Sequence, residues 1–263
     1  MAKPPADFSR RELLLGGLSA GVLLAAPLRA RAQGPLACSL TPELTEGPFY
    51  IDAGRLRRNI TEGRPGVPLR LRIALLDIDG CTPLKGAAVD VWHCDALGRY
   101  SGYGEQAGPP PHPPGEGPPP FAGSGMPPPG GPGHPPKPQP GNRQIFLRGV
   151  QLTDAAGLAQ FDTVYPGWYA GRAVHIHLKV HAGGQVCHTG QIALPEDACA
   201  AVALTPSYAG HKAERMRAEQ DGIFRGNAAA ATLKLTPLGT GAAAGYIGDI
   251  AFCVDPRAVP QVF

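Results

Sequence analysis

Two histidines one residue apart carry the strongest chemical signal in this sequence. His175 and His177 lie in an alternating segment, residues 174–180, which follows a Pro-Gly turn flanked by Tyr165 and Tyr169. Successive side chains of a strand point to opposite faces, so both imidazoles project from the same side. Two imidazoles on one rigid strand can form half of a metal site, although the same spacing also occurs on solvated polar faces.

A second group of candidate ligands is phenolic. Gly98 turns the chain out of a predicted strand at residues 87–94 and sends Tyr100 toward the end of that strand. Tyr100 and Tyr169 would complete a set of two phenols and two imidazoles. A phenol has an ordinary pKa of about 10, so two phenolate ligands at neutral pH require a strongly Lewis-acidic cation. The hard, oxygen-seeking Fe(III) ion fits this donor set better than zinc or copper.

A series of motifs resembles the intradiol ring-cleavage dioxygenases. In chain order they are 89–95 (VDVWHCD), 98–101 (GRYS), 146–149 (FLRG), 153–157 (TDAAG), 166–169 (PGWY), 172–177 (RAVHIH) and 189–191 (TGQ). Their order and spacing match the family from about residue 41 to residue 255. Several motifs in the same order are far more specific than a single His-x-His pair.

The resemblance implies a particular metal centre and reaction. Its non-haem Fe(III) ion would be held, together with a hydroxide, by four side chains: Tyr100, Tyr169, His175 and His177. Catalytic roles would fall to Tyr169, which would accept a substrate proton, and to Arg172 and Gln191 on the substrate side. The implied reaction cleaves the ring of a small catechol-type substrate with O2 and gives a muconate-type diacid.

Three alternatives stay open at the level of sequence. Tyr165 is a rival to Tyr169, because only five residues separate Tyr169 from His175, fewer than in better-known family members. A metallohydrolase would combine the histidines with Asp154 or Asp162 and would leave both tyrosines without a role. The non-enzymatic alternative is an exported β-sandwich that binds a partner through these side chains, since fold alone does not imply function.

The apolar pattern predicts an all-β fold, a β-sandwich of mostly antiparallel strands with short helices and a long Pro/Gly-rich loop. Residues 69–77 and 87–94 are predicted to pair antiparallel, and a turn at 154–157 is predicted to close a hairpin between 150–153 and 158–162. Another hairpin joins the histidine segment to 186–194 through 182–184, with Gln191 able to share the histidine face. The remaining expected elements are helices near 196–202 and 210–220 and strands at 231–235 and 245–254.

Residues 104–142 form a segment of a different kind. They hold 16 of the 31 prolines and ten glycines, so they cannot supply a core and are expected to be an exposed excursion. His112 and His134 within it are poor candidates for metal ligands, because a flexible loop holds metal geometry badly. Three arginines near the start of the domain, Arg55, Arg57 and Arg58, either receive a substrate carboxylate or are solvated, and solvation is the commoner case.

The N-terminal residues 1–32 read as a twin-arginine signal peptide. Arg10 and Arg11 precede an apolar run, and a small-residue cleavage site follows at 30–32. This predicts export to the periplasm or the extracellular space, with no stable membrane anchor after cleavage, because the run is short for a bilayer span. The domain itself would be residues 33–263.

Charge and cysteine content bear on partners and compartment. The signal segment carries the whole formal net charge of +3, so the domain that remains is neutral and a nucleic-acid partner is not expected. All six cysteines lie after the predicted cleavage site, at positions 38, 81, 94, 187, 199 and 253. Disulfides suit an exported protein, but the sequence does not select a pairing. A homo-oligomer is compatible with the sequence.

Overall fold

The computed structural model describes residues 38–103 and 139–259, all of which belong to one compact unit, Pro35–Phe263. The predicted signal segment, His112, His134 and nearly all of the Pro/Gly-rich loop lie outside the described residues. Within these two ranges, no helix has the length and apolar character needed to cross a membrane.

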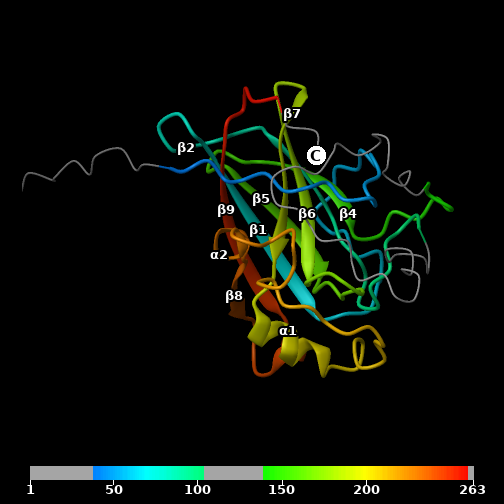
Figure 1. Cartoon of the computed structure of the whole chain (residues 1–263). Coiled ribbons are helices and arrows are strands. Elements are labelled where there is room, and N and C mark those ends of the chain that lie inside the picture. Colours follow the sequence, from blue (N-terminus) through cyan, green and yellow to red (C-terminus); the bar gives the residue numbers. More distant parts are fainter. Residues whose placement is uncertain (1–37, 104–138, 260–263) are drawn as a thin grey trace, which may run out of the picture. The chain divides into compact units, whose positions relative to one another are not determined.

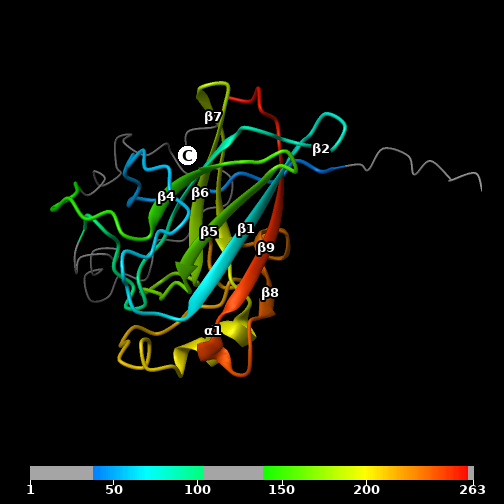
Figure 2. The same ribbon diagram turned by 180° about the vertical axis from the view of Figure 1, so that it is seen from behind.

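The described residues form two β-sheets that pack into a sandwich (Figures 1 and 2). The first sheet contains β1 (Pro68–Asp77), β2 (Thr82–Pro83), β5 (Leu158–Val164), β8 (Lys234–Pro237) and β9 (Tyr246–Val254). The second contains β3 (Ala88–Trp92), β4 (Arg148–Leu152), β6 (His175–Ala182) and β7 (Gln185–Ala193). The same described residues also contain three short helices, namely α1 (Glu196–Ala203), α2 (Ala228–Ala231) and the 3-10 helix η2 (Ala242–Ala244). All strand pairs are antiparallel except β1 with β9, which confirms the predicted all-β sandwich.

Alternation along the strands builds the core between the sheets. In β1, every second residue from Leu69 to Leu75 is buried, while Arg70 and Arg72 face outward. In β6, Ile176, Leu178 and Val180 point into the same core. The opposite face of β6, which bears the histidines, is also buried because residues 43–50 run across it. The histidine face of this sheet is therefore an enclosed layer and not a solvated surface.

Two predicted strand pairings are wrong, and for one physical reason. The segments 69–77 and 87–94 do not pair, because β1 and β3 belong to different sheets. The segments 150–153 and 158–162 also do not pair, although the turn between them is present and Asp154 accepts hydrogen bonds from the backbone of Ala156 and Leu158. Strand alternation identifies the buried face of a strand but not its partner. Both connections are crossovers from one sheet to the other.

The later elements agree better with the sequence. The β6–β7 hairpin is confirmed, and its register places His177 opposite Gln191. Helix α1 and strand β9 are confirmed, whereas β8 begins only at Lys234 because α2 precedes it. The predicted helix at 210–220 is wrong: this stretch is mostly irregular, contains an isolated bridge from Met216 to Ala173, and ends in a turn. Directly after it, the Asp221 side chain accepts a backbone hydrogen bond from Ile223, which competes with helical pairing.

One disulfide joins Cys38 to Cys81. The other cysteines of the described residues, Cys94, Cys187, Cys199 and Cys253, are buried free thiols.

Candidate metal centre

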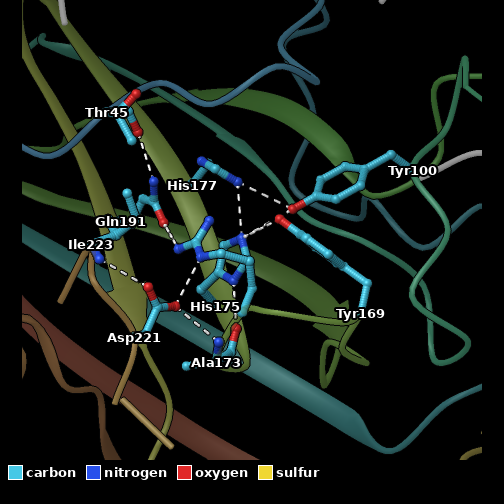
Figure 3. Close-up of polar contacts among 10 residues, drawn as sticks. Thr45, Tyr100, Tyr169, Ala173, His175, His177, Gln191, Asp221 and Ile223 are labelled. Atoms are coloured by element: carbon cyan, nitrogen blue, oxygen red, sulfur yellow. Dashed lines mark hydrogen bonds and ion pairs between the residues drawn. The ribbon is translucent and has the colours of Figure 1, made fainter. Parts of the chain in front are cut away.

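Four potential metal ligands meet on the covered face of the second sheet (Figure 3). His175 and His177 come from β6, Tyr100 from the turn after β3, and Tyr169 from the segment between β5 and β6. The hydroxyl oxygens of Tyr100 and Tyr169 lie 3.3 Å and 3.2 Å from His175 Nε2. His177 Nε2 lies 3.1 Å from His175 Nε2 and 3.1 Å from the Tyr100 oxygen.

The donor set fits a single metal ion. His175 Nδ1 lies 2.6 Å from the Ala173 carbonyl oxygen, which can only accept, so Nδ1 carries the proton and Nε2 presents a lone pair. Three polar atoms crowd this one lone pair, although it can accept only one well-formed hydrogen bond. At metal–ligand distances of about 2.0–2.2 Å, neighbouring ligand atoms of one ion lie roughly 3 Å apart, as these atoms do. The spacing of these donor atoms therefore fits a single cation at the centre of the group.

The tyrosines are essential members of this set. Histidine, cysteine and carboxylate side chains alone form no group of three or more that could hold a metal within residues 38–103 and 139–259. Burial lowers the pKa of both imidazoles well below the ordinary value, which keeps them neutral and able to ligate. Burial also raises the pKa of Tyr169, and that of Tyr100 well above the ordinary value. Only a strongly Lewis-acidic cation would displace both phenolic protons at neutral pH.

Two glycines set the separation of the tyrosine-bearing segments. Gly98 has φ of 79°, and a Cβ there would lie 2.1 Å from the Trp168 carbonyl oxygen. A Cβ on Gly167 would lie 2.5 Å from the Ala96 oxygen and 2.6 Å from the Asp95 oxygen. The two segments therefore touch backbone to backbone, which no larger residue permits.

Gly167→Ala is expected to weaken metal binding and stability together. The added methyl group must push the Tyr169 segment away from the Tyr100 turn, which separates the two phenols. Overpacking of this kind costs about 1–3 kcal/mol. Metal content per chain after loading and the thermal unfolding midpoint measure the two effects. Gly210→Ala is the matched control, because a Cβ at Gly210 meets no atom within 4 Å and both properties should stay unchanged. Full metal content in Gly167→Ala would contradict this role.

The second histidine is clamped on two sides. The Trp92 ring stacks on the His177 ring, with centroids 4.9 Å apart and planes inclined by 6°. Gly47, with φ of 73°, approaches so closely that a Cβ there would lie 2.9 Å from His177 Cε1. Trp92 and the segment around Gly47 thus hold the His177 ring of β6 in one orientation.

A guanidinium and an amide lie beside the four donors. Arg172 Nε donates to Asp221 Oδ2 at 2.8 Å, and Arg172 Nη2 donates to Gln191 Oε1 at 2.5 Å. Gln191 Nε2 donates in turn to the Thr45 carbonyl oxygen at 2.7 Å. Figure 3 shows Gln191 and Asp221 on the same side of the histidines. The structure thus brings the predicted Arg172 and Gln191 together at the centre.

Arg148 and Asp221 are site residues that the sequence did not reveal as such. Arg148 of β4 is fully buried and donates to the Ser101 Oγ and to the Ser101 carbonyl oxygen, next to Tyr100. Burial lowers the pKa of Arg148 to about 10, so it remains a cation at neutral pH. Arg148 lies within the 146–149 motif, so the sequence pointed to this segment but not to a role for the arginine. Asp221 lies in none of the motifs.

Several candidate residues lie elsewhere. The Tyr165 hydroxyl contacts Cys199 Sγ at 3.2 Å within the main core, away from the four donors. Asp154 occupies the turn between β4 and β5, and Asp162 pairs with Arg58 on the other sheet. Neither aspartate therefore joins the two histidines, as the metallohydrolase alternative would require. Arg57 donates to the carbonyl oxygens of Ile145 and Arg148, which is a structural role.

Comparison with known proteins shows the family to which this chain belongs. No protein-family model and no curated protein matches the sequence. Among solved structures, an intradiol ring-cleavage dioxygenase from Tetranychus urticae is 30% identical with a TM-score of 0.70, and the match covers 86% of this chain and 98% of that chain. This chain therefore belongs to the intradiol ring-cleavage dioxygenases, as its motifs predicted, and it is an enzyme of that class.

Two more distant structures share the fold. The dioxygenase domain of a dioxygenase and carbohydrate-binding protein fusion from Streptomyces sp. SirexAA-E is 24% identical with a TM-score of 0.53, over 82% of this chain and 99% of that chain. Catechol 1,2-dioxygenase from Acinetobacter sp. ADP1 is 18% identical with a TM-score of 0.51, over 84% of this chain and 67% of that chain. These two likenesses concern the β-sandwich alone.

Proposed function

We propose that this dioxygenase binds one non-haem Fe(III) ion and cleaves the ring of a catechol between its two hydroxylated carbons, giving a muconate-type diacid. The observation that carries the proposal is the convergence of two phenols and two neutral imidazoles. His175 Nε2 lies within 3.3 Å of both phenolic oxygens and of His177 Nε2, and His177 Nε2 lies 3.1 Å from the Tyr100 oxygen. Hard phenolate oxygens favour Fe(III) over softer divalent ions. When bound, the Fe(III) ion supplies the Lewis acidity and electronic coupling that make a catechol ring reactive toward O2.

A catechol must lose both hydroxyl protons to bind through both oxygens. A phenolate of the protein beside it can accept one of them, and the hydroxide at the centre would accept the other. Tyr169 suits this role better than Tyr100, since it is 7% exposed whereas Tyr100 is 0% exposed. Tyr100 also contacts both imidazoles, while Tyr169 contacts His175.

Arg172 would stabilise negative charge on the ring. Its guanidinium is held by Asp221 and Gln191, so it is oriented before substrate arrives. A preorganised cation in a site with little water stabilises developing charge more than a mobile one. Gln191 orients the guanidinium through its oxygen, because its amide nitrogen is committed to the Thr45 carbonyl.

Product analysis tests this function. Iron-loaded enzyme should consume O2 with catechol, hydroxyquinol or protocatechuate, and labelled 18O2 should place one labelled oxygen atom in each of the two carboxyl groups that ring cleavage creates. Formation of a ring-opened semialdehyde, or no O2 consumption with any of these catechols, would contradict the proposal.

Export is part of the proposal. Residues 1–32 have the twin-arginine pattern, and the disulfide between Cys38 and Cys81 suits an oxidising compartment. The twin-arginine route carries folded proteins, which would allow iron to be loaded in the cytoplasm. Conversion of Arg10 and Arg11 to lysine should retain the protein in the cytoplasm, as cell fractionation would show; unchanged export would argue against this route.

A further inference from the structure

Asp221 is a buried carboxylate whose oxygens are all occupied. Its side chain is 1% exposed and lies at the edge of the candidate metal centre (Figure 3). Oδ2 accepts hydrogen bonds from Arg172 Nε at 2.8 Å and from the Ala173 backbone N–H at 2.9 Å. Oδ1 accepts from the Ile223 N–H at 2.9 Å. A carboxylate with these three donors is held in one orientation.

Through Asp221 and Gln191, the guanidinium of Arg172 is fixed at two points. Nε is bound to Asp221, and Nη2 is bound to Gln191 Oε1. The Thr45 carbonyl can only accept, so it orients the Gln191 amide with its oxygen toward Arg172. Nη1 is the guanidinium nitrogen that makes no hydrogen bond to any of the described residues, and the Arg172 side chain remains 13% exposed. This nitrogen is the one left for substrate.

The same carboxylate also connects to a candidate ligand. Asp221 accepts the Ala173 N–H, and the Ala173 carbonyl accepts the Nδ1 proton of His175. Ala173 thus lies between the carboxylate and the imidazole that presents its Nε2 to the other donors. One residue from a distant turn therefore contacts both the substrate-side cation and the backbone next to His175, and iron content reports any effect through the second contact.

We propose that Asp221 is a positioning residue for ring cleavage, which holds the Arg172 guanidinium in the orientation that leaves Nη1 for the substrate. This inference rests on the proposed function, because a catechol bound through both oxygens is the anion that the guanidinium would face. Misplacing a charged group by about 1 Å can lower a rate about 10²-fold. Asp221 acts through Arg172 and does not touch substrate.

The test is a double-mutant cycle in the iron-loaded full chain. Asp221→Asn should lower kcat by about 10- to 100-fold, while iron content and the visible band of the resting enzyme stay at the wild-type level. Arg172→Lys keeps the positive charge but lacks the planar guanidinium, which contacts Asp221 and Gln191 at the same time. In the Arg172→Lys background, Asp221→Asn should cause no further loss of kcat, because the interaction through which it acts is already gone.

The cycle separates positioning from general destabilisation. Losses of kcat that simply multiply in the double variant, or an Asp221→Asn enzyme with wild-type kcat, would overturn the proposal. Asp249→Asn is the matched control, since Asp249 pairs with Arg72 at 2.6 Å on the other sheet and its replacement should leave kcat unchanged. If Asp221→Asn does not fold, Asp221→Glu keeps the charge, shifts the carboxylate by one methylene, and enters the same cycle. A wild-type enzyme without iron or O2 consumption would instead refute the proposed function itself.

Discussion

Tyr169→Phe is expected to lose the bound iron or its colour, and with it ring cleavage, whereas Tyr165→Phe keeps both. The Tyr169 hydroxyl is one of the four donors, and it is also the candidate proton acceptor. Removing a general base alone lowers a rate about 10²- to 10⁴-fold, and loss of a ligand adds to that effect. Iron content, the visible spectrum and O2 consumption of the two variants measure the difference.

Tyr165→Phe is a matched control because it removes the same oxygen four residues earlier in the chain. The Tyr165 hydroxyl contacts Cys199 in the core, so its loss should cost only about 1 kcal/mol of stability. The same reasoning predicts loss of iron or colour in Tyr100→Phe, His175→Ala and His177→Ala. A coloured, active Tyr169→Phe together with a bleached Tyr165→Phe would reverse the assignment of the second tyrosine.

Arg172→Gln is expected to lower kcat by about 10²- to 10³-fold, the range seen when a group that stabilises transition-state charge is removed. Iron should remain bound, because none of the four donors is changed. The variant also leaves Asp221 as a buried carboxylate without its cation, and breaking a buried pair costs about 3–5 kcal/mol. Saturating-substrate kinetics and thermal unfolding measure these two losses.

Arg72→Gln provides the comparison for Arg172→Gln. Arg72 likewise pairs with an aspartate, Asp249, through both Nε and Nη2, but on the partly exposed face of the other sheet. Its replacement should leave kcat and iron content unchanged. An Arg172→Gln enzyme that turns over at the rate of Arg72→Gln would contradict a role for Arg172 in charge stabilisation.

Local pattern was sufficient to place the main chemical groups. The alternation around His175 and His177 correctly put both imidazoles on one face, and the β6–β7 register brought Gln191 to that face. Glycine at position 98 correctly marked the turn that presents Tyr100. These features depend on neighbouring residues or on a short hairpin, which is why the sequence predicts them.

Long-range features could not be predicted in the same way. The alternation of β1 and β3 identifies their buried faces, but it contains no information about which sheet each strand joins. Asp221 lies 49 residues from Arg172, directly after the stretch 210–220 that was predicted to be helical, and its side chain accepts a hydrogen bond from the Ile223 N–H. The covering of the histidine face by residues 43–50 is likewise a tertiary contact without a local signal.

The visible absorption spectrum of the purified protein, with its iron content, tests the central claim most directly. It should be recorded before and after catechol is added without O2. The account predicts a broad band in the blue-to-green region at about one iron per chain, with a shift to longer wavelength when catechol binds. A protein that stays colourless after reconstitution with iron would contradict a tyrosinate-bound Fe(III) centre.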